Sequence, residues 1–297
     1  MKRSTVQMRK YKFKRAAVPY LFLLPFLILY LLFFLWPAVY SFILSLLKYS
    51  GYGSAKWVGL QNYINLFQYD TMWKCLGNTV FYFIFSFIPT MFFSFLLALA
   101  VRSRRATRLR SVYKPLIFLP QICAVVASSL CFKIIFGERV GVINQFLGTS
   151  IPFLTDPSWM RWTVVILLSW RGIGWYFIIY LSGLTTIGDD ITEAAEIDGA
   201  NGLQNLWHII LPMMRPTFMV AFITNAIGSF KIYTEPNLLL AQNYDPPMKV
   251  APYINLIINS MSGGQFGMAA AAGWILVLII LLLTLLQLKF LGGRNDE

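Results

Sequence analysis

Six long apolar stretches limit what this chain can fold into more than any other feature of its sequence. They cover residues 16–47, 78–101, 115–136, 162–184, 216–234 and 268–290. A helix of about 20 apolar residues crosses the hydrocarbon core of a bilayer. Helices are expected, because isolated strands leave backbone groups unpaired in lipid and no alternating pattern of about ten residues recurs, as a barrel requires. The sequence therefore predicts an all-α integral membrane protein with six transmembrane helices.

The composition of the whole chain agrees with this prediction. Of its residues 58% are hydrophobic and 12% are charged, and the mean hydropathy is +0.64, which fits poorly with a soluble domain. The first stretch is too long for a signal peptide, and no small-residue cleavage site follows it. It is expected to be a retained helix that is broken or tilted near Pro25 or Pro37.

Lysine and arginine are unevenly distributed between the segments that join these stretches. With the N-terminus in the cytoplasm, the inside segments hold sixteen of them and the outside segments six, so the positive-inside rule favours two cytoplasmic termini. The expected organisation is a basic cytoplasmic N-terminus (1–15), a single transmembrane domain (16–290) and a cytoplasmic tail (291–297). The net charge of +13 then reflects topology and anionic lipid head groups rather than a nucleic-acid-binding face.

The sequence offers no metal-binding or nucleotide-binding pattern. Cys75, Cys123 and Cys131 form no CxxC pair, and a single histidine completes no metal-ligand set. The cysteines are expected to be small buried apolar side chains. Because no G-x-x-x-x-G-K-[ST] loop occurs, we expect the chain to bind no cofactor and to use energy from a partner or an ion gradient.

One polar segment lies between the fourth and fifth apolar stretches. It reads EAAEIDGANGLQNLWHIILP, residues 193–212, and contains the only histidine. Asp190 and Glu193 have the spacing of a capping box, and Asn201 and Gln204 repeat that spacing. Two short helices are therefore predicted to begin in this segment.

The same segment contains two predicted helix ends. Gly199 can end the first helix in a left-handed conformation, and Pro212 is expected to end the second. The prediction is a helix-turn-helix within a cytoplasmic loop, residues 186–215. Its small and acidic side chains suit docking in a basic groove of a partner, and a solvated amphipathic connector is the alternative interpretation.

A family resemblance favours the docking interpretation. EAA at 193–195, DGA at 198–200 and IILP at 209–212, with Pro216 beyond, resemble the cytoplasmic signature of permease subunits of binding-protein-dependent ABC importers. Four further motifs are similar to the carbohydrate-uptake branch of that family: GLQNY at 59–63, WRGIGW at 170–175, LSGL at 181–184 and GMAAAAG at 267–273. The resemblance covers the chain from about residue 19 to residue 291.

This resemblance implies partners and a mechanism. Such a permease pairs with a second, similar permease and sits on two copies of an ATP-binding subunit, which use ATP and Mg, while an extracellular solute-binding protein delivers a sugar or oligosaccharide. The chain itself would be no enzyme, and it would lie in the inner or plasma membrane of a bacterium. The coupling contact with the ATPase would be made by Glu193, Ala194, Ala195, Asp198, Gly199, Ala200, Leu211 and Pro212. Closure of the ATPase would rock the spans between inward-open and outward-facing states.

A charged residue in the fourth stretch is the first candidate for the solute pathway. A charge near the middle of a span is costly and marks a cavity or an ion pair. Helical spacing predicts that Arg171 shares a face with Trp175 and Ile178, with Trp170 beside it, and a cation with an indole can bind a sugar. The alternative is that Arg171 pairs with an acid or a backbone carbonyl of the partner permease.

The fifth stretch supplies the remaining pathway candidates. Asn225 and Ser229 lie one turn apart, and the alternative for them is polar packing between helices. Lys231 and Glu235 are four residues apart, and they can instead pair with each other.

An ion-gradient-driven secondary transporter or a channel subunit is the alternative function, with Arg171 and Lys231 as its charged sites. Against it, the first four stretches contain no carboxylate for coupling to protons or sodium. Intramembrane catalysis is weaker still, because the only histidine lies in the polar segment.

Overall fold

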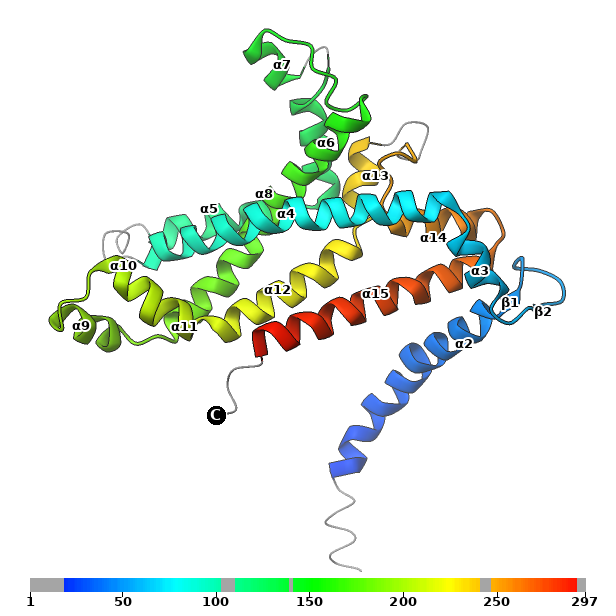
Figure 1. The fold of residues 1–297 in the computed structure, drawn as a ribbon, viewed down its shortest axis with the longest axis horizontal. Coiled ribbons are helices and arrows are strands. Elements are labelled where there is room, and N and C mark those ends of the chain that lie inside the picture. Colours follow the sequence, from blue (N-terminus) through cyan, green and yellow to red (C-terminus); the bar gives the residue numbers. More distant parts are fainter. Residues whose placement is uncertain (1–18, 103–109, 139–140, 241–246, 293–297) are drawn as a thin grey trace, which may run out of the picture. The chain divides into compact units, whose positions relative to one another are not determined.

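The computed structural model describes residues 19–102, 110–138, 141–240 and 247–292. They fall into two compact units. Unit 1 takes in the chain up to Asn65 together with Ser260–Trp274, and unit 2 takes in Leu66–Asn259 and the chain from Ile275 onward. The predicted N-terminal segment 1–15 and the tail beyond residue 292 lie outside the described residues. The single domain over 16–290 stays a prediction, because the positions of the parts relative to one another are not determined (Figure 1).

Four described helices are long and apolar enough to cross a membrane, and the number reaches six if each of two bent helix pairs is one span. The four are Pro19–Ser45, α4 (Asp70–Arg102), α8 (Pro157–Thr185) and α15 (Phe266–Gly292). The bent pairs are α5 (Arg110–Ile122) with α6 (Val125–Ile135), and the helical run Gly202–Met213 with α12 (Arg215–Phe230). The predicted all-α membrane architecture is confirmed.

Short elements join these helices. They are β1 (Leu47–Lys48), β2 (Lys56–Trp57), α3 (Gln61–Phe67), α7 (Val142–Leu147), α9 (Asp189–Ile197), α13 (Thr234–Leu240) and α14 (Tyr253–Ser262). The two strands pair antiparallel, with Leu47 opposite Trp57.

The first span is a continuous helix, so the expected break near Pro25 or Pro37 is wrong. A π turn, η1 (Leu31–Leu35), precedes α2 (Trp36–Ser45), and the Trp36 amide donates to the carbonyl of Leu31. Proline has no amide hydrogen, and in an ordinary α-helix its ring crowds the carbonyl four residues back. The wider turn that ends two residues before Pro37 accommodates the proline, so the helix continues through it.

The third span differs from the continuous helix that its apolar stretch predicts. Between α5 and α6 the chain bends by 90°, and Ala124 has an extended backbone (ψ 138°). A break inside an apolar region frees a backbone carbonyl that needs a donor. The carbonyl of Cys123 accepts a hydrogen bond from Arg171, 48 residues further along the chain, and this contact stabilises the bend.

The fifth span ends earlier than predicted. Helix α12 ends at Phe230, Lys231 has left the helical backbone, and Glu235 lies in the next helix, α13. The two residues therefore do not lie one turn apart on a single helix. The spacing argument for a Lys231–Glu235 pair is wrong for this reason.

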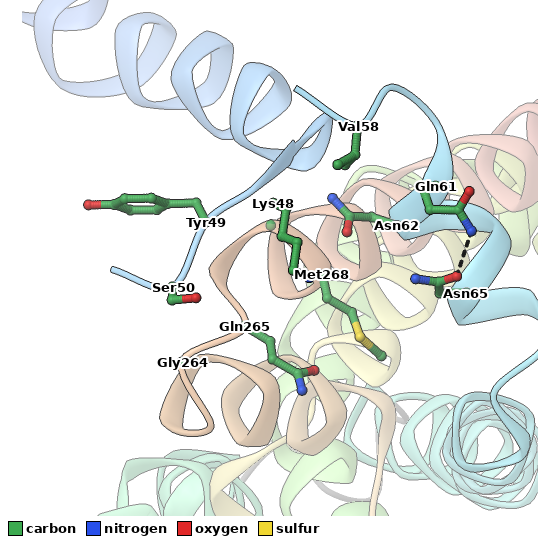
Figure 2. A pocket seen from close by; sticks show the side chains of 11 residues that line it. Lys48, Tyr49, Ser50, Val58, Gln61, Asn62, Asn65, Gly264, Gln265 and Met268 are labelled. Atoms are coloured by element: carbon green, nitrogen blue, oxygen red, sulfur yellow. Dashed lines mark hydrogen bonds between the residues drawn. The ribbon is translucent and has the colours of Figure 1, made fainter. Parts of the chain in front are cut away.

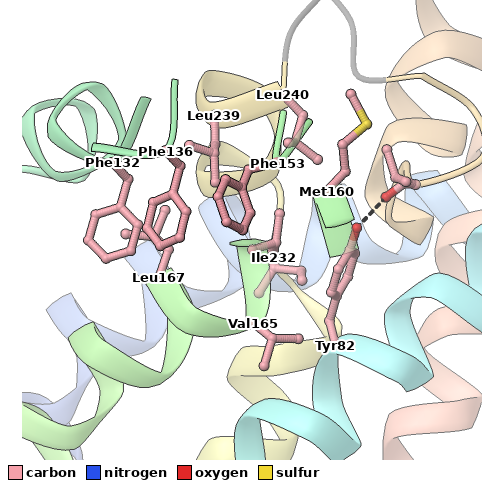
Figure 3. Packing of buried hydrophobic residues seen from close by; sticks show 12 residues of the cluster. Tyr82, Phe132, Phe136, Phe153, Met160, Val165, Leu167, Ile232, Leu239 and Leu240 are labelled. Carbon is pink, nitrogen blue, oxygen red and sulfur yellow. Dashed lines mark hydrogen bonds between the residues drawn. The ribbon is translucent and has the colours of Figure 1, made fainter. Parts of the chain in front are cut away.

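Helices α4 and α8 pack along each other in unit 2 (Figure 1). A buried aromatic and aliphatic cluster lies at one end of this packing, formed by α4, α6, α8, α13 and the segments between them (Figure 3). Within it the rings of Phe136 and Phe153 meet edge to face at 5.3 Å, a favoured geometry for aromatic pairs. The cluster fixes α6 and α13 against α8.

Helix α4 also holds the chain that leads into α14. The side chains of Asn78 and Tyr82 donate to the carbonyls of Ala251 (3.0 Å) and Val250 (2.6 Å), and the latter bond is drawn in Figure 3. The amide of Tyr253 donates to the hydroxyl of Thr79 at 2.8 Å. Polar side chains on one face of α4 thereby satisfy a non-helical backbone segment, as burial requires.

Candidate coupling element and buried arginine

The predicted helix-turn-helix is present as α9, a turn, α10 (Gly202–Asn205), the π turn η3 (Leu206–Ile210) and α11 (Leu211–Met213). We call residues 189–213 the helix-turn-helix element. Helix α9, which carries Glu193, Ala194 and Ala195, has no buried residue. Large apolar side chains on the element are exposed, with Ile197 at 87% and Leu203 at 65%. These exposed apolar side chains leave apolar area on the element that a partner surface can cover.

The turn of this element is a Schellman motif centred on Gly199. Its φ is +85°, so the predicted left-handed conformation is confirmed. The amide of Ala200 donates to the carbonyl of Ala195 at 2.9 Å, and the amide of Gly199 donates to the carbonyl of Glu196 at 3.1 Å. Both bonds satisfy carbonyls at the end of α9 that the helix itself leaves open. Asp198 is the C-cap residue immediately before this turn.

One of the two predicted capping boxes is present. The amide of Gln204 donates to Asn201 Oδ1 at 2.9 Å, and the amide of Asn201 donates to Gln204 Oε1 at 2.8 Å. This reciprocal pair begins α10, as predicted.

The other predicted box, Asp190 with Glu193, is wrong. Helix α9 begins two residues earlier than that box requires, at Asp189, and its N-cap Gly188 makes no side-chain cap. Two acids in the first turn of α9 instead favour its amino end through the helix dipole. Arg102, at the end of α4, donates to the carbonyl of Ile187 at 3.0 Å and so fixes the chain just before α9.

Pro212 does not end the second helix, contrary to the prediction. The amide of Leu211 donates to the carbonyl of Leu206 in the π turn, and the helix continues through Pro212 to Met213. A π turn ends two residues before Pro212, as another does before Pro37 in the first span, and the wider turn accommodates a proline that would interrupt an ordinary ladder. A bend of 65° follows, immediately before α12.

Arg171 is buried at the break of the third span. Its Nη1 donates to the carbonyl of Cys123 (3.2 Å) and to Ser128 Oγ (3.1 Å), and its Nε lies 4.0 Å from Glu235 Oε1. Side-chain exposures of 10% for Arg171 and 19% for Glu235 place this ion pair largely away from solvent. The arginine therefore joins α8 to α6, to the bend and to α13 within one chain.

The predicted neighbours of Arg171 point elsewhere. Trp170 is 39% exposed, with its ring 5.4 Å from that of Phe132, and Trp175 is 46% exposed. Arg171 is buried and lies toward Glu235, whereas Trp175, one turn further along α8, is largely accessible. The role of Trp170, Arg171 and Trp175 in binding a solute stays a prediction.

Asn225 and Ser229 lie together and are buried. Ser229 Oγ donates to Asn225 Oδ1 at 3.3 Å, and the hydroxyl of Tyr176 on α8 interacts with the side chains of Thr224 and Asn225. In this conformation they form polar contacts between α12 and α8. Their role in the solute pathway stays a prediction, as does that of the exposed Lys231.

Residues 77–290 match the family described as the binding-protein-dependent transport system inner membrane component. This chain belongs to that family. The permease is 32% identical over 289 residues to the lactose transport system permease protein LacF of Rhizobium radiobacter, with 94% of each chain covered. It is 29% identical over 291 residues to the arabinooligosaccharides transport system permease protein AraP of Bacillus subtilis (strain 168), with 96% of this chain and 92% of that one covered.

The fold of the permease is also similar to that of a solved structure. A bacterial ABC transporter involved in the import of the acidic polysaccharide alginate aligns with a TM-score of 0.83 at 24% identity, covering 97% of this chain and all of that one. The resemblance inferred from the sequence motifs is thus confirmed.

The GLQNY motif of the permease has a structural role that its sequence did not predict. Asn62 is buried, and its Nδ2 donates to the carbonyls of Ser45 (2.8 Å) and Leu47 (2.9 Å) at the end of the first span. The hydroxyls of Tyr63 and Ser45 are 2.7 Å apart. A side chain on Gly267, which begins GMAAAAG, would collide with the carbonyl of Leu47. The two motifs therefore meet at the hollow drawn in Figure 2 and hold unit 1 together.

Proposed function

We propose that this permease imports a sugar or oligosaccharide as one of two transmembrane subunits of an ATP-driven transporter. An extracellular solute-binding protein delivers the solute, and two ATP-binding subunits hydrolyse ATP with Mg, while this chain binds no cofactor. The similarity to lactose and arabinooligosaccharide permeases supports the solute class. Both termini lie in the cytoplasm, as the distribution of cations favours.

A single observation carries the coupling role: the helix-turn-helix element is exposed along α9 yet fixed in shape by its turn and its cap. A connector whose shape is fixed by its turn and its cap can transmit a displacement from a partner to the spans, which a flexible loop cannot do. In the proposed complex the element docks on the cytoplasmic ATPase, and movement of the ATPase displaces α9 and α10. Glu193 and Asp198 supply carboxylates for a basic groove. The small side chains of Ala194, Ala195 and Ala200 allow the element to fit into that groove.

The ion-gradient alternative gains no support from the geometry. Arg171, its main candidate for a charged site, is paired with Glu235 and with polar groups of the α5–α6 bend. A site that couples transport to an ion gradient needs a charge that changes partner or protonation during transport. Here the partners of the arginine hold α6, the bend and α13 against α8.

Reconstitution tests the proposal. The chain purified alone is expected to show no ATPase activity, and addition of its ATP-binding subunits and the second permease should produce activity that the loaded solute-binding protein stimulates. ATP hydrolysis by the purified chain alone, or solute uptake driven by an ion gradient without any ATPase, would contradict it.

A further inference from the structure

Three cations surround one hollow in unit 2. Lys74 near the start of α4, Arg161 in the first turns of α8 and Lys249 line a cavity of about 310 Å³, together with Pro157 and Ser158. None of the described residues that line it is acidic. Like charges around a common hollow repel one another, and a bound anion removes that cost.

Arg161 is fixed in place at this hollow. Its Nη2 donates to the carbonyl of Lys249 at 2.9 Å, and its guanidinium lies over the ring of Phe81 at 5.6 Å. Its Nε is buried, with no hydrogen-bond partner among the described residues. A guanidinium held in this way presents its donors in a set geometry, which suits a planar carboxylate.

The segment that carries Lys249 is also held. Lys249 directly precedes Val250, whose carbonyl accepts from Tyr82 of α4, and the next carbonyl accepts from Asn78. Lys74 and Lys249 are exposed, so an incoming group can reach them. The backbone that carries Lys249 is already held and needs no ordering on binding, which favours affinity.

The amino end of α8 does not explain these cations. Asp156 caps that helix by accepting from the amides of Ser158 and Trp159 at 2.9 and 3.4 Å. The helix end is therefore already satisfied by an acid of its own chain. The cations instead surround space that an external group can enter.

We infer that this hollow receives an acidic side chain of the docked solute-binding protein. This inference rests on the proposed function, which places the starts of α4 and α8 at the outer face. An anionic solute is the less suitable occupant, because it would next meet the interior, where Arg171 is already paired with Glu235. Charge pairs at the edge of an interface mainly set the rate and the orientation of docking.

The test uses the complete transporter in nanodiscs, and it measures ATP hydrolysis while the concentration of its solute-binding protein is raised. Lys74→Glu and Lys249→Glu should each raise the half-maximal concentration about tenfold at low ionic strength, relative to the rate of the same variant without binding protein. In about 1 M salt the difference should largely disappear, because charges are then screened beyond about 3 Å. Lys56→Glu is the matched control, since Lys56 is exposed on β2 and does not line the hollow.

Two results would overturn the inference. One is a titration curve that both reversals leave unchanged. The other is a change only in the solute concentration needed for uptake, which would make the solute the occupant. The unaltered complex tests the proposed function separately. If no solute-binding protein stimulates its ATP hydrolysis, both the proposed function and the inference are contradicted. If the unaltered complex is stimulated normally and the variants behave like it, the inference alone is contradicted.

Discussion

Substitution of Gly199 tests whether the turn of the helix-turn-helix element carries coupling. Gly199 has a φ of +85°, and an added Cβ would meet no atom within 4 Å. The cost of a side chain there is therefore backbone strain alone, about 1–2 kcal/mol for an L-residue in the left-handed region and more for a β-branched one. An energy of that size changes the ratio of formed to distorted turn roughly 5- to 30-fold.

Gly199→Val should therefore lower solute-stimulated ATP hydrolysis and solute uptake together, while the spans still fold and insert. Both activities should fall because the element that joins them is distorted, whereas a solute-pathway defect would reduce uptake more than hydrolysis. Gly199→Asn should have a smaller effect, since asparagine tolerates the left-handed conformation better than other residues. Gly202→Ala is the matched control, because Gly202 also faces open space but has no left-handed backbone.

The assay compares ATP hydrolysis and uptake in the same reconstituted vesicles, with helix content measured by circular dichroism to confirm insertion. Normal coupling in Gly199→Val, with the complex assembled, would refute the reasoning and leave the element as a simple connector. Equal losses in Gly199→Val and Gly202→Ala would also refute it, because only the first substitution strains the backbone.

Three further outcomes follow from the contacts described above. Arg171→Met should lower the free energy of unfolding by roughly 2–4 kcal/mol because Glu235 loses its partner, and adding Glu235→Gln should recover part of that loss. If uptake is lost while the melting temperature is unchanged, the arginine belongs to the solute pathway. Gly267→Ala should destabilise the protein by about 1–3 kcal/mol through its collision with the carbonyl of Leu47, measured by thermal unfolding; Gly273→Ala, which meets open space, is the control and should not. A cysteine replacing Gln204 should react with an impermeant thiol reagent only from the cytoplasmic side, and labelling from outside intact cells would contradict the topology.

The features that the sequence predicted correctly depend on neighbouring residues. A stretch of about 20 apolar residues is sufficient to predict a span. The left-handed turn at Gly199 and the capping box of Asn201 with Gln204 each involve residues within five positions of one another. Such patterns can be recognised without knowing the fold.

The features that were missed depend on distant partners or on a choice between similar local geometries. The bend at Cys123 and Ala124 is supported by Arg171, and no pattern within the third stretch contains that donor. The orientation of Arg171 is set by Glu235, which lies beyond the end of α12. An ordinary α-helical ladder is interrupted by proline, so the sequence alone predicts a helix end at Pro212, whereas the π turn before it lets the helix continue.

The described contacts divide the helix-turn-helix element into two stiff parts with one turn between them. Before α9, Arg102 ties the chain to the end of α4 through the carbonyl of Ile187. After α10, the helix is continuous to Met213, and the amides of Met214 and Phe218 donate to the carbonyls of Ile210 and Met214 across the bend into α12. A push on α9 therefore acts first on α4, and a push on α10 acts first on α12.

Concerted movement of α4 and α12 then requires that α9 and α10 keep their relative angle. That angle is set by the Schellman turn at Gly199 together with the Asn201 cap. Loss of the Asn201 cap removes its hydrogen bond to the first turn of α10, which costs about 1 kcal/mol, but it leaves the direction of the chain unchanged. Loss of the left-handed turn changes that direction, so α9 and α10 would no longer face one partner surface at the same time. For this reason Gly199, rather than any acid of the EAA segment, is the position at which a single substitution should lower ATP hydrolysis and solute uptake together.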